Sequence, residues 1–496
     1  MAQISYKSTR SAENSVSSLE AIIRGIAEDG GLYVPSFLPC IDKPLNQLAS
    51  MTYSELAFYI MKKFFSEFSD QELLCCIENA YDEKFDTEEI VPVVKKDDTY
   101  FLELFHGPTL AFKDMALSVL PHLMTSAAKK LNRSEEIVIL TATSGDTGKA
   151  ALEGFKDVEN TKIIVFYPQN GVSQIQKRQM ITQKGKNTYV CGINGNFDDA
   201  QTGVKEVFND KELCMQLGKN NIILSSANSI NIGRLVPQIV YYFYAYANLL
   251  KNKDIQIGEK INVVVPTGNF GNILAAYYAK KMNLPINRLI CASNENNVLY
   301  DFIRTGIYDK RRELKVTTSP SMDILISSNL ERLLYDLSTN DAQLVSNMMQ
   351  KLSSDGFYEI PVQMKGKLKD FYGGFCDEQE TYKSIRDIYN RTGYVIDTHT
   401  AVAYSVYQKY KKDTSDHTKT VVVSTASPFK FTKSVCKALL LEVDNYNDFQ
   451  LLYKLSQSAE LKVPYTIKDL ENKKIVHDNI CNKTDIRSVV KNILKA

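Results

Sequence analysis

The chain has 496 residues, a length that predicts two or three domains. Hydrophobic residues make up 44% and charged residues 24%, which is the balance of a soluble globular protein. Its 59 lysines and arginines nearly cancel its 58 aspartates and glutamates. The overall charge therefore gives no reason to expect a nucleic-acid or anionic-membrane partner, and any anion must be recognised locally.

The leader and thiol patterns favour a cytoplasmic protein. The nine cysteines are scattered without a C-x-x-C pair, and the five histidines do not stand beside them at zinc spacing, so we expect reduced thiols and no metal site. The N-terminus, MAQISYKSTR, lacks the apolar core of a secretory signal. The most apolar run, 239–250, is too short and too tyrosine-rich to span a bilayer and predicts a buried helix.

The first 98 residues are predicted to form a separate N-terminal domain. Helical periodicity runs through 18–28, with Gly30 and Gly31 as the stop signal, and two more amphipathic helices are expected at 53–68 and 70–81. The acidic, turn-rich segment 97–100 is expected to close this domain.

The region 99–440 is predicted to be an α/β unit, because apolar β-rich runs alternate with helical segments. Strands are expected at 136–143, 162–168, 188–193, 221–227, 261–268, 288–293 and 419–427, with helices that include 173–182, 198–208 and a long one after Arg234. Such repeats favour two parallel-sheet domains with helices on both faces. The alternation stops between about 300 and 385, which predicts a helical insertion, and 441–496 is expected to be a C-terminal helical tail.

Two glycine-containing turns follow predicted strands: Thr143 to Gly148 (TSGDTG) and Thr267 to Asn272 (TGNFGN). In open α/β sheets ligands bind at the carboxyl ends of the strands, and backbone N–H groups at helix N-termini can hold a carboxylate or a phosphate. Neither turn is a Walker loop or a G-x-G-x-x-G fingerprint. Each alone is equally well a tight capped loop; the pair favours anion sites without identifying the ligand.

Lys113 lies in the apolar stretch FHGPTLAFKD, just after a Gly-Pro turn. Most lysines are on the surface. Removal from water lowers the pKa of a lysine and makes its amine a nucleophile toward a carbonyl group.

These segments resemble motifs of the threonine synthases. FHGPTLAFKD (105–114) resembles the lysine motif of that family, TATSGDTGKAAL (141–152) its substrate-carboxylate loop, and PTGNFGN (266–272) its cofactor-phosphate loop. Further matching segments are YKSTR (6–10), IAEDGGLYVP (26–35), SSANSINIGRLVPQ (225–238), PSMDILISSNLER (320–332) and STASPFKF (424–431). The resemblance covers most of the chain, in order.

The resemblance implies a pyridoxal 5′-phosphate enzyme of fold type II, the tryptophan synthase β-like fold. Lys113 would be the catalytic residue that carries the cofactor as a Schiff base. Thr425 would hydrogen-bond the pyridine nitrogen, which leaves that nitrogen neutral. The cradle for the cofactor phosphate would consist of Gly268, Asn269, Phe270, Gly271 and Asn272.

The implied reaction is the last step of threonine biosynthesis, in which O-phospho-L-homoserine and water give L-threonine and phosphate. Arg234 is the best candidate for the substrate phosphate, because its planar fork suits that group, and Asn228, Ser229 and Asn231 could assist. Lys149 and Arg332 are weaker candidates, and His106 either stacks near the cofactor or is a satisfied core histidine. The α-carboxylate would be held by Ser144, Gly145, Asp146 and Thr147.

Two positions depart from the family pattern. Asn272 stands where some relatives have aspartate, and Thr398 stands in DTHTAVAY where proline is expected. Three other interpretations remain: another enzyme of the same fold, such as a threonine dehydratase or a cysteine-synthase-like protein; a threonine-synthase-like protein without turnover; and a nucleotide-binding protein without pyridoxal phosphate. We expect a monomer or a homodimer.

Overall fold

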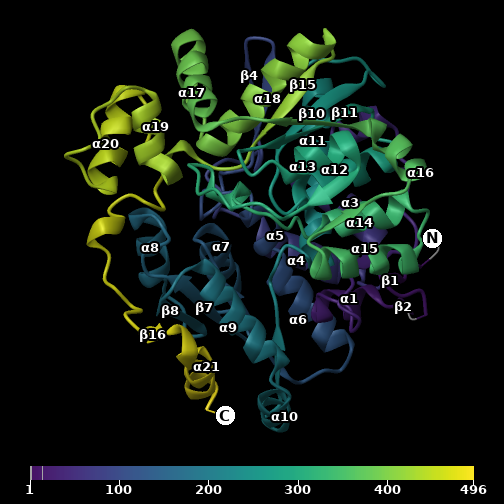
Figure 1. The fold of residues 1–496 in the computed structure, drawn as a ribbon, viewed down its shortest axis with the longest axis vertical. Coiled ribbons are helices and arrows are strands. Elements are labelled where there is room, and N and C mark those ends of the chain that lie inside the picture. Colours follow the sequence, from purple (N-terminus) through teal and green to yellow (C-terminus); the bar gives the residue numbers. More distant parts are fainter. Residues whose placement is uncertain (1–2, 14, 496) are drawn as a thin grey trace.

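Two sheets of mostly parallel strands form the frame of the protein, seen in a computed structural model that describes residues 3–13 and 15–495 (Figure 1). The larger sheet has the order β14-β11-β10-β15-β5-β4, and β4 is its antiparallel strand. Its strands are β4 (Val93–Lys96), β5 (Thr99–Glu103), β10 (Ile261–Pro266), β11 (Ile286–Ser293), β14 (Phe371–Phe375) and β15 (Thr420–Ser424).

The smaller sheet is parallel throughout and has the order β16-β8-β7-β6-β9. The predicted class, an α/β fold with two parallel sheets, is therefore confirmed. The strands of this sheet are β6 (Glu136–Ala142), β7 (Thr161–Pro168), β8 (Thr188–Asn194), β9 (Ile222–Ser225) and β16 (Ile480–Asn482).

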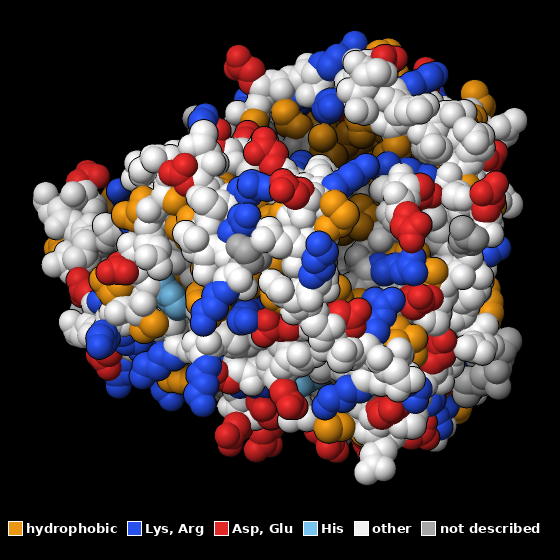
Figure 2. Space-filling view, turned by 90° about the horizontal axis from the view of Figure 1, so that it is seen from below, with side chains coloured by type: hydrophobic (Ala, Val, Ile, Leu, Met, Phe, Trp, Pro, Cys, Tyr) orange, Lys and Arg blue, Asp and Glu red, His pale blue; other side chains and the backbone are white. Residues whose placement is uncertain are grey.

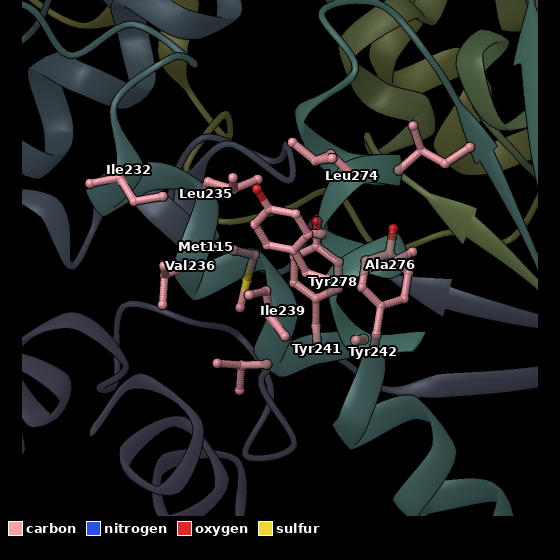
Figure 3. Close-up of a cluster of buried hydrophobic side chains, with 14 of the residues drawn as sticks. Met115, Ile232, Leu235, Val236, Ile239, Tyr241, Tyr242, Leu274, Ala276 and Tyr278 are labelled. Atoms are coloured by element: carbon pink, nitrogen blue, oxygen red, sulfur yellow. The ribbon is translucent and has the colours of Figure 1, made fainter. Parts of the chain in front are cut away.

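The helix α11 (Ile232–Lys251) is the buried helix that the apolar run predicted. It packs against α12 (Gly271–Lys281) and against α3 of the N-terminal domain, and Figure 3 shows its side chains interleaved with those of α12. Tyr241 and Tyr242 point toward α12, and their hydroxyls donate to Asn272 at its start. The hydrophobic core thus holds the N-terminal end of α12, and the turn before it, in place.

The N-terminal domain combines a small antiparallel sheet, β1 (Tyr6–Ser8), β2 (Ser15–Val16) and β3 (Tyr33–Pro35), with helices α1 (Ser18–Arg24), α2 (Leu45–Leu48), α3 (Tyr53–Phe64) and α4 (Asp70–Ala80). The three predicted long helices are present. The first ends earlier than predicted, because Gly25, at φ 70°, caps α1 before Gly30 is reached. Thr52 and Ser69 close capping boxes that fix the starts of α3 and α4.

The prediction that 97–100 closes the N-terminal domain is wrong. Asp97, at φ 51°, lies in a tight turn between β4 and β5, and these two strands form a hairpin within the larger sheet. Every residue of β5 is buried, because β5 pairs with β15 and is covered on both faces. A boundary at residue 98 would divide this hairpin.

The sequence predicts a helical insertion between about 300 and 385, but the structure also has strands in this segment. It includes the hairpin β12 (Ile307–Asp309) and β13 (Phe357–Glu359), and it supplies β14 at the edge of the larger sheet. Its helical elements are α13 (Val298–Thr305), the 3-10 turns η1 (Pro320–Met322) and η2 (Gly366–Asp370), α14 (Leu330–Leu337), α15 (Ala342–Ser354), α16 (Val362–Lys365) and the start of α17 (Glu378–Thr392). Short strands that pair with distant partners leave little periodicity for sequence analysis to detect.

The C-terminal tail is also not only helical. After α20 (Asp448–Ser458) the chain crosses to the smaller sheet, adds β16 beside β8, and ends with α21 (Ile486–Leu494), as Figure 1 shows at its yellow end.

The remaining helices are α5 (Asp114–Leu117), α6 (Leu120–Lys130), α7 (Asp146–Phe155), α8 (Gln174–Ile181), α9 (Phe197–Asn209), α10 (Lys211–Lys219), α18 (Thr398–Thr414), the 3-10 turn η3 (Pro428–Phe431) and α19 (Thr432–Ala438).

Acidic and basic side chains are interspersed on the face drawn in Figure 2, as the balanced composition implies. In the described ranges, no helix is both long and apolar enough to cross a membrane.

Candidate active site

A backbone pairing between two distant motifs places Lys113. The segment 110–112 runs antiparallel to 425–427: the Phe112 N–H donates to the Thr425 carbonyl at 2.8 Å, and the Ser427 N–H donates to the Leu110 carbonyl at 3.0 Å. Since Thr425 directly follows β15, Lys113 lies at the carboxyl ends of the central strands. The structure thus brings together Lys113 and Thr425, which the sequence separates by more than half of the chain.

The loop before Lys113 is closed by Asp114. Its carboxylate accepts from the Thr109 N–H at 2.8 Å and from the Thr109 hydroxyl at 2.5 Å. Burial raises the pKa of Asp114 to about 6, against the lowering effect of these hydrogen bonds. Gly107 leaves room for this arrangement, because a Cβ there would lie 2.6 Å from the Asp114 side chain.

The amine of Lys113 is buried, with 9% of the residue exposed. Its Nζ lies 3.1 Å from the Ser321 Oγ and 3.4 Å from the Asp146 Oδ2. Burial is the largest influence and lowers the pKa of Lys113; the positive charges of Lys430 and Arg234 act in the same direction, and Asp146 opposes them. The environment therefore makes the neutral amine, the form that attacks a carbonyl carbon, easier to reach than it is for a lysine in water.

The predicted phosphate loop connects β10 with α12. Its carbonyl groups accept hydrogen bonds from one side, and its N–H groups point to the other side. The Gly268 carbonyl accepts from the Ser327 hydroxyl at 2.7 Å, and the Asn269 carbonyl accepts from the Asn329 N–H at 3.1 Å. In a trans peptide the N–H points opposite to the C=O, so the N–H groups of Asn269 and Phe270 face the other side of the loop. Together with the free N–H groups of the first turn of α12, they form a cradle for an anion.

Gly268 couples this loop to Lys113. A Cβ on Gly268 would lie 2.4 Å from the carbonyl oxygen of Ser321, whose hydroxyl contacts the lysine. Phe270 adopts the left-handed conformation, at φ 64°, and its ring packs on Phe371 at 5.9 Å between centroids. The turn η1 thus touches both the lysine and the loop.

The loop predicted to hold the substrate carboxylate stands at the start of α7. The Thr143 hydroxyl accepts from the N–H groups of Gly145 and Gly148, which fixes the turn, and Ser144 is exposed at its tip. The Asp146 carboxylate is already paired with Lys113 and, at 2.8 Å, with Lys430. A carboxylate repels another carboxylate, so Asp146 can hold a substrate anion only through its backbone.

Arg234 is a buried guanidinium that has no counter-ion among residues 3–13 and 15–495. It is 3% exposed, its Nη1 donates to the Ala227 carbonyl at 2.8 Å, and its Nε has no hydrogen-bond partner among the described residues. Burial lowers its pKa to about 10, so it remains charged at neutral pH. An unpaired buried cation is costly, which marks the position as one that receives an anion.

The asparagines near Arg234 have different environments. Asn228 is exposed. Both ends of the Asn231 amide are engaged by protein: its Nδ2 donates to the Ile22 carbonyl at 2.9 Å, and its Oδ1 accepts from the Gly233 N–H at 2.8 Å. Asn231 therefore holds the turn that carries Arg234 and links it to the N-terminal domain.

The weaker candidates are occupied by structural contacts. Lys149 pairs with Glu153 at 2.7 Å and also donates to Gln183. Arg332 donates to the Tyr33 carbonyl at 2.9 Å and to the Ile230 carbonyl at 2.5 Å, and it also donates to Asn329. The His106 Nε2 lies 2.8 Å from the Glu103 Oε2, and its Nδ1 lies 2.5 Å from the Asp86 Oδ1. Of the two alternatives for His106, this matches the histidine whose hydrogen bonds are satisfied within the protein.

Sequence analysis missed Lys430, Ser321 and His399. Lys430 is fully buried on Asp146, Ser321 contacts Lys113, and the His399 Nε2 accepts from the Ser321 N–H at 3.2 Å. The signal for Lys430 was a lysine within the apolar segment PFKF. Among the described residues, no group of three or more histidine, cysteine, aspartate and glutamate side chains could hold a metal ion.

These features fit pyridoxal 5′-phosphate. Lys113 has a buried amine, and the loop 268–272 has N–H groups that could hold the phosphate. Lys113, Lys430 and Arg234 are three basic side chains, and within the described chain Asp146 is the one carboxylate within ion-pair distance of any of them. An anionic ligand would remove this excess of positive charge.

The fold and the site together define a pyridoxal-phosphate-dependent enzyme, and comparison with known proteins agrees. The family model "Pyridoxal-phosphate dependent enzyme" matches residues 93–426, "Threonine synthase N terminus" matches 5–81, and "Threonine synthase, C-terminal" matches 400–488. Threonine synthase of Saccharomyces cerevisiae is 37% identical over 88% of this chain and 89% of that protein. The chain belongs to the threonine synthase family.

A solved structure and a human relative complete the comparison. A PLP-bound threonine synthase from Brucella melitensis superposes with a TM-score of 0.88 at 34% identity and covers 99% of both chains. Human "Threonine synthase-like 1" is 42% identical over 88% of this chain. The chain spans about 60% of the length of that human relative.

Proposed function

We propose that the protein is a threonine synthase that converts O-phospho-L-homoserine and water into L-threonine and phosphate. The family supports this proposal, and so do two groups that can bind anions besides the loop for the cofactor phosphate. The substrate has an α-carboxylate and a γ-phosphate, and the loop at the start of α7 and the guanidinium of Arg234 are separate positions for them.

The observation that carries the proposal is the unpaired Arg234. The phosphate cradle alone fits any enzyme of this cofactor class. Arg234 lies on a different element, α11, close enough to Lys113 that its charge lowers the pKa of the lysine. A second buried cation of this kind suits a substrate that carries a phosphate of its own.

The protein groups have distinct tasks in this reaction. Bound pyridoxal 5′-phosphate supplies an electron sink beside the substrate amino group. Ser144, Gly145 and Thr147, with the backbone of Asp146, hold the α-carboxylate, while Arg234, assisted by Asn228 and Ser229, holds the γ-phosphate. The amine of Lys113 removes one proton each from Cα and Cβ. Phosphate leaves Cγ, Cγ receives a proton to become a methyl group, the hydroxyl of a water molecule adds at Cβ, and a proton is returned to Cα. Thr425, which directly follows β15, would hydrogen-bond the pyridine nitrogen of the bound cofactor.

A second candidate is a threonine-synthase-like protein that removes phosphate without forming threonine. Its motivation is the 42% identity to a human protein that is called threonine synthase-like and not threonine synthase, against 37% identity to the yeast enzyme. The two functions differ in whether water is added at Cβ.

The test is to incubate the purified chain with pyridoxal 5′-phosphate and O-phospho-L-homoserine and to measure threonine and inorganic phosphate together. Equimolar release of both, absent from Lys113→Ala, is the expected result. Release of phosphate without threonine would support the second candidate. If a chain that binds the cofactor releases neither product, both candidate functions are excluded.

We also propose a cytoplasmic location and a monomer or homodimer that acts on a small molecule. The location is supported by the thiols of Cys191 and Cys481, which lie 3.5 Å apart as free cysteines and so suit a reducing compartment. Sedimentation analysis of the full chain distinguishes the two assembly states.

A further inference from the structure

Lys430 joins three parts of the site through one ammonium group. Its Nζ lies 2.8 Å from the Asp146 Oδ1, donates to the Thr109 carbonyl at 2.9 Å, and lies 3.4 Å from the Gln179 Oε1. Its side chain is completely buried. Since an ammonium has three N–H groups, these partners account for all of them and hold the side chain in one position.

Asp146 is shared between two lysines. Its Oδ1 faces Lys430, and its Oδ2 faces Lys113 at the longer distance of 3.4 Å. The Gln176 Nε2 also donates to Oδ1, at 2.8 Å. The lysines, the glutamine and burial together leave the pKa of Asp146 well below its usual range, because the attraction of the cations outweighs the cost of burial.

This sharing has a chemical consequence. If Lys113 were the only partner of Asp146, loss of its proton would leave a buried carboxylate unpaired, which is strongly unfavourable. The ion pair would then keep Lys113 protonated and unreactive. With Lys430 in place, Asp146 keeps a counter-ion when Lys113 becomes neutral.

We propose that Lys430 is a positioning residue that releases Lys113 from its ion pair with Asp146, so that Lys113 is available as the neutral amine for the cofactor. The proposal rests on the role of Lys113 as the cofactor lysine and not on the identity of the substrate. Lys430 acts through Asp146, whose carboxylate it holds ionised and paired.

The charged groups that face Lys113 come from each neighbouring element. They are Asp146 from α7, Lys430 from η3 and Arg234 from α11. Asp114, next in sequence, is turned toward Thr109, and His399 on α18 reaches the lysine only through the Ser321 N–H. Removal of Lys430 takes away a repelling charge and leaves Asp146 dependent on Lys113, so both effects raise the pKa of Lys113.

The experiment measures how the full-length chain, freed of cofactor, captures added pyridoxal 5′-phosphate at a series of pH values. The visible absorption of the lysine-bound cofactor gives the rate. Reductive methylation of the cofactor-free chain, followed by peptide mass spectrometry at Lys113, reports the neutral amine without any cofactor. Neither measurement needs substrate, so failure of the proposed reaction would leave this test intact.

For Lys430→Met we expect the pH midpoint of both measurements to rise by about one unit, which makes capture at neutral pH about tenfold slower. Lys430→Arg keeps the charge and is expected to keep the midpoint near that of the unmodified protein. Asp146→Asn should move it the opposite way, and Lys430→Met combined with Asp146→Asn should reverse the rise.

A merely structural role for Lys430 would lower the melting temperature and leave the midpoint unchanged. An unshifted midpoint in Lys430→Met would therefore overturn the proposal. If that variant does not fold, Asp146→Asn decides alone: a midpoint that does not fall would overturn the proposal equally.

Discussion

Arg10 and Glu331 form a two-point ion pair between the N-terminal domain and α14. The Arg10 Nε lies 2.9 Å from the Glu331 Oε1, and its Nη2 lies 2.8 Å from Oε2. The Thr9 hydroxyl also donates to Glu331, at 2.5 Å. Because α14 directly follows the segment 327–329 that supports the phosphate loop, this pair connects the N-terminal domain to the cofactor site.

Replacement of Glu331 by glutamine should loosen this connection. Glu331 is 5% exposed, so the loss of its charge leaves Arg10 without its bidentate partner and costs about 1–3 kcal/mol of stability. Thermal unfolding and the rate of proteolysis of the N-terminal domain measure the effect. Glu88→Gln, at an exposed position, is the matched control and should change neither.

Gly268→Ala should impair cofactor binding. The added Cβ would meet the backbone oxygen of Ser321 at 2.4 Å, so either the loop or η1 must move. We expect at least a tenfold loss in affinity for pyridoxal 5′-phosphate, measured by absorbance titration. Gly218→Ala is the control: it lies in α10 with no atom near the new Cβ, and it should stabilise the protein by about 0.5–1 kcal/mol.

His106 should make stability depend on pH. Burial alone would lower its pKa, but hydrogen bonds to and the charges of Asp86 and Glu103 raise the pKa to about 9. A pKa above the unfolded value of about 6.5 means that the stabilisation is complete below that value and is lost as pH rises through 9. Its size is on the order of 3 kcal/mol.

The measurement for His106 is the melting temperature across this pH range. His106→Gln should remove the decline on the alkaline side and reduce the difference between neutral and alkaline solution. A decline of equal size in the variant would show that other groups cause it.

Arg332→Lys should have a larger effect on the stability of the fold than on the binding of the substrate. Burial lowers the pKa of Arg332 to about 10, and three acceptors surround its guanidinium. A lysine cannot reach all three from one position, so about 2–4 kcal/mol is lost. Chemical denaturation measures this loss. A raised KM with unchanged stability would instead support a role in holding the substrate phosphate.

Arg234→Met should have the opposite signature. Removal of an unpaired buried charge raises the melting temperature of the ligand-free chain, because the cost of desolvation disappears. The same change should abolish the stabilisation that inorganic phosphate gives and should raise KM for the substrate at least tenfold. A lower melting temperature would mean that the hydrogen bond from Arg234 to the Ala227 carbonyl outweighs the cost of burying its charge.

The sequence by itself determined the class of fold, and it also predicted Lys113 and the two glycine turns as parts of the site. Buried parallel strands such as 136–142 and 261–266 have continuous apolar runs. Glycine-containing turns directly after strands predict ligand-binding loops from the local sequence. These signals lie within short segments and need no knowledge of distant contacts. The same holds for the buried helix 232–251.

Only the tertiary structure decided how the charges are shared. Asp146, Lys430 and Arg332 look alike in sequence as polar residues in ligand-binding motifs. Their partners come from elsewhere in the chain, so burial and pairing fix whether each holds a ligand, another side chain or the backbone. The hairpin of β4 and β5 and the pairing of β16 with β8 escaped prediction for the same reason, since strand pairing depends on contacts between distant residues.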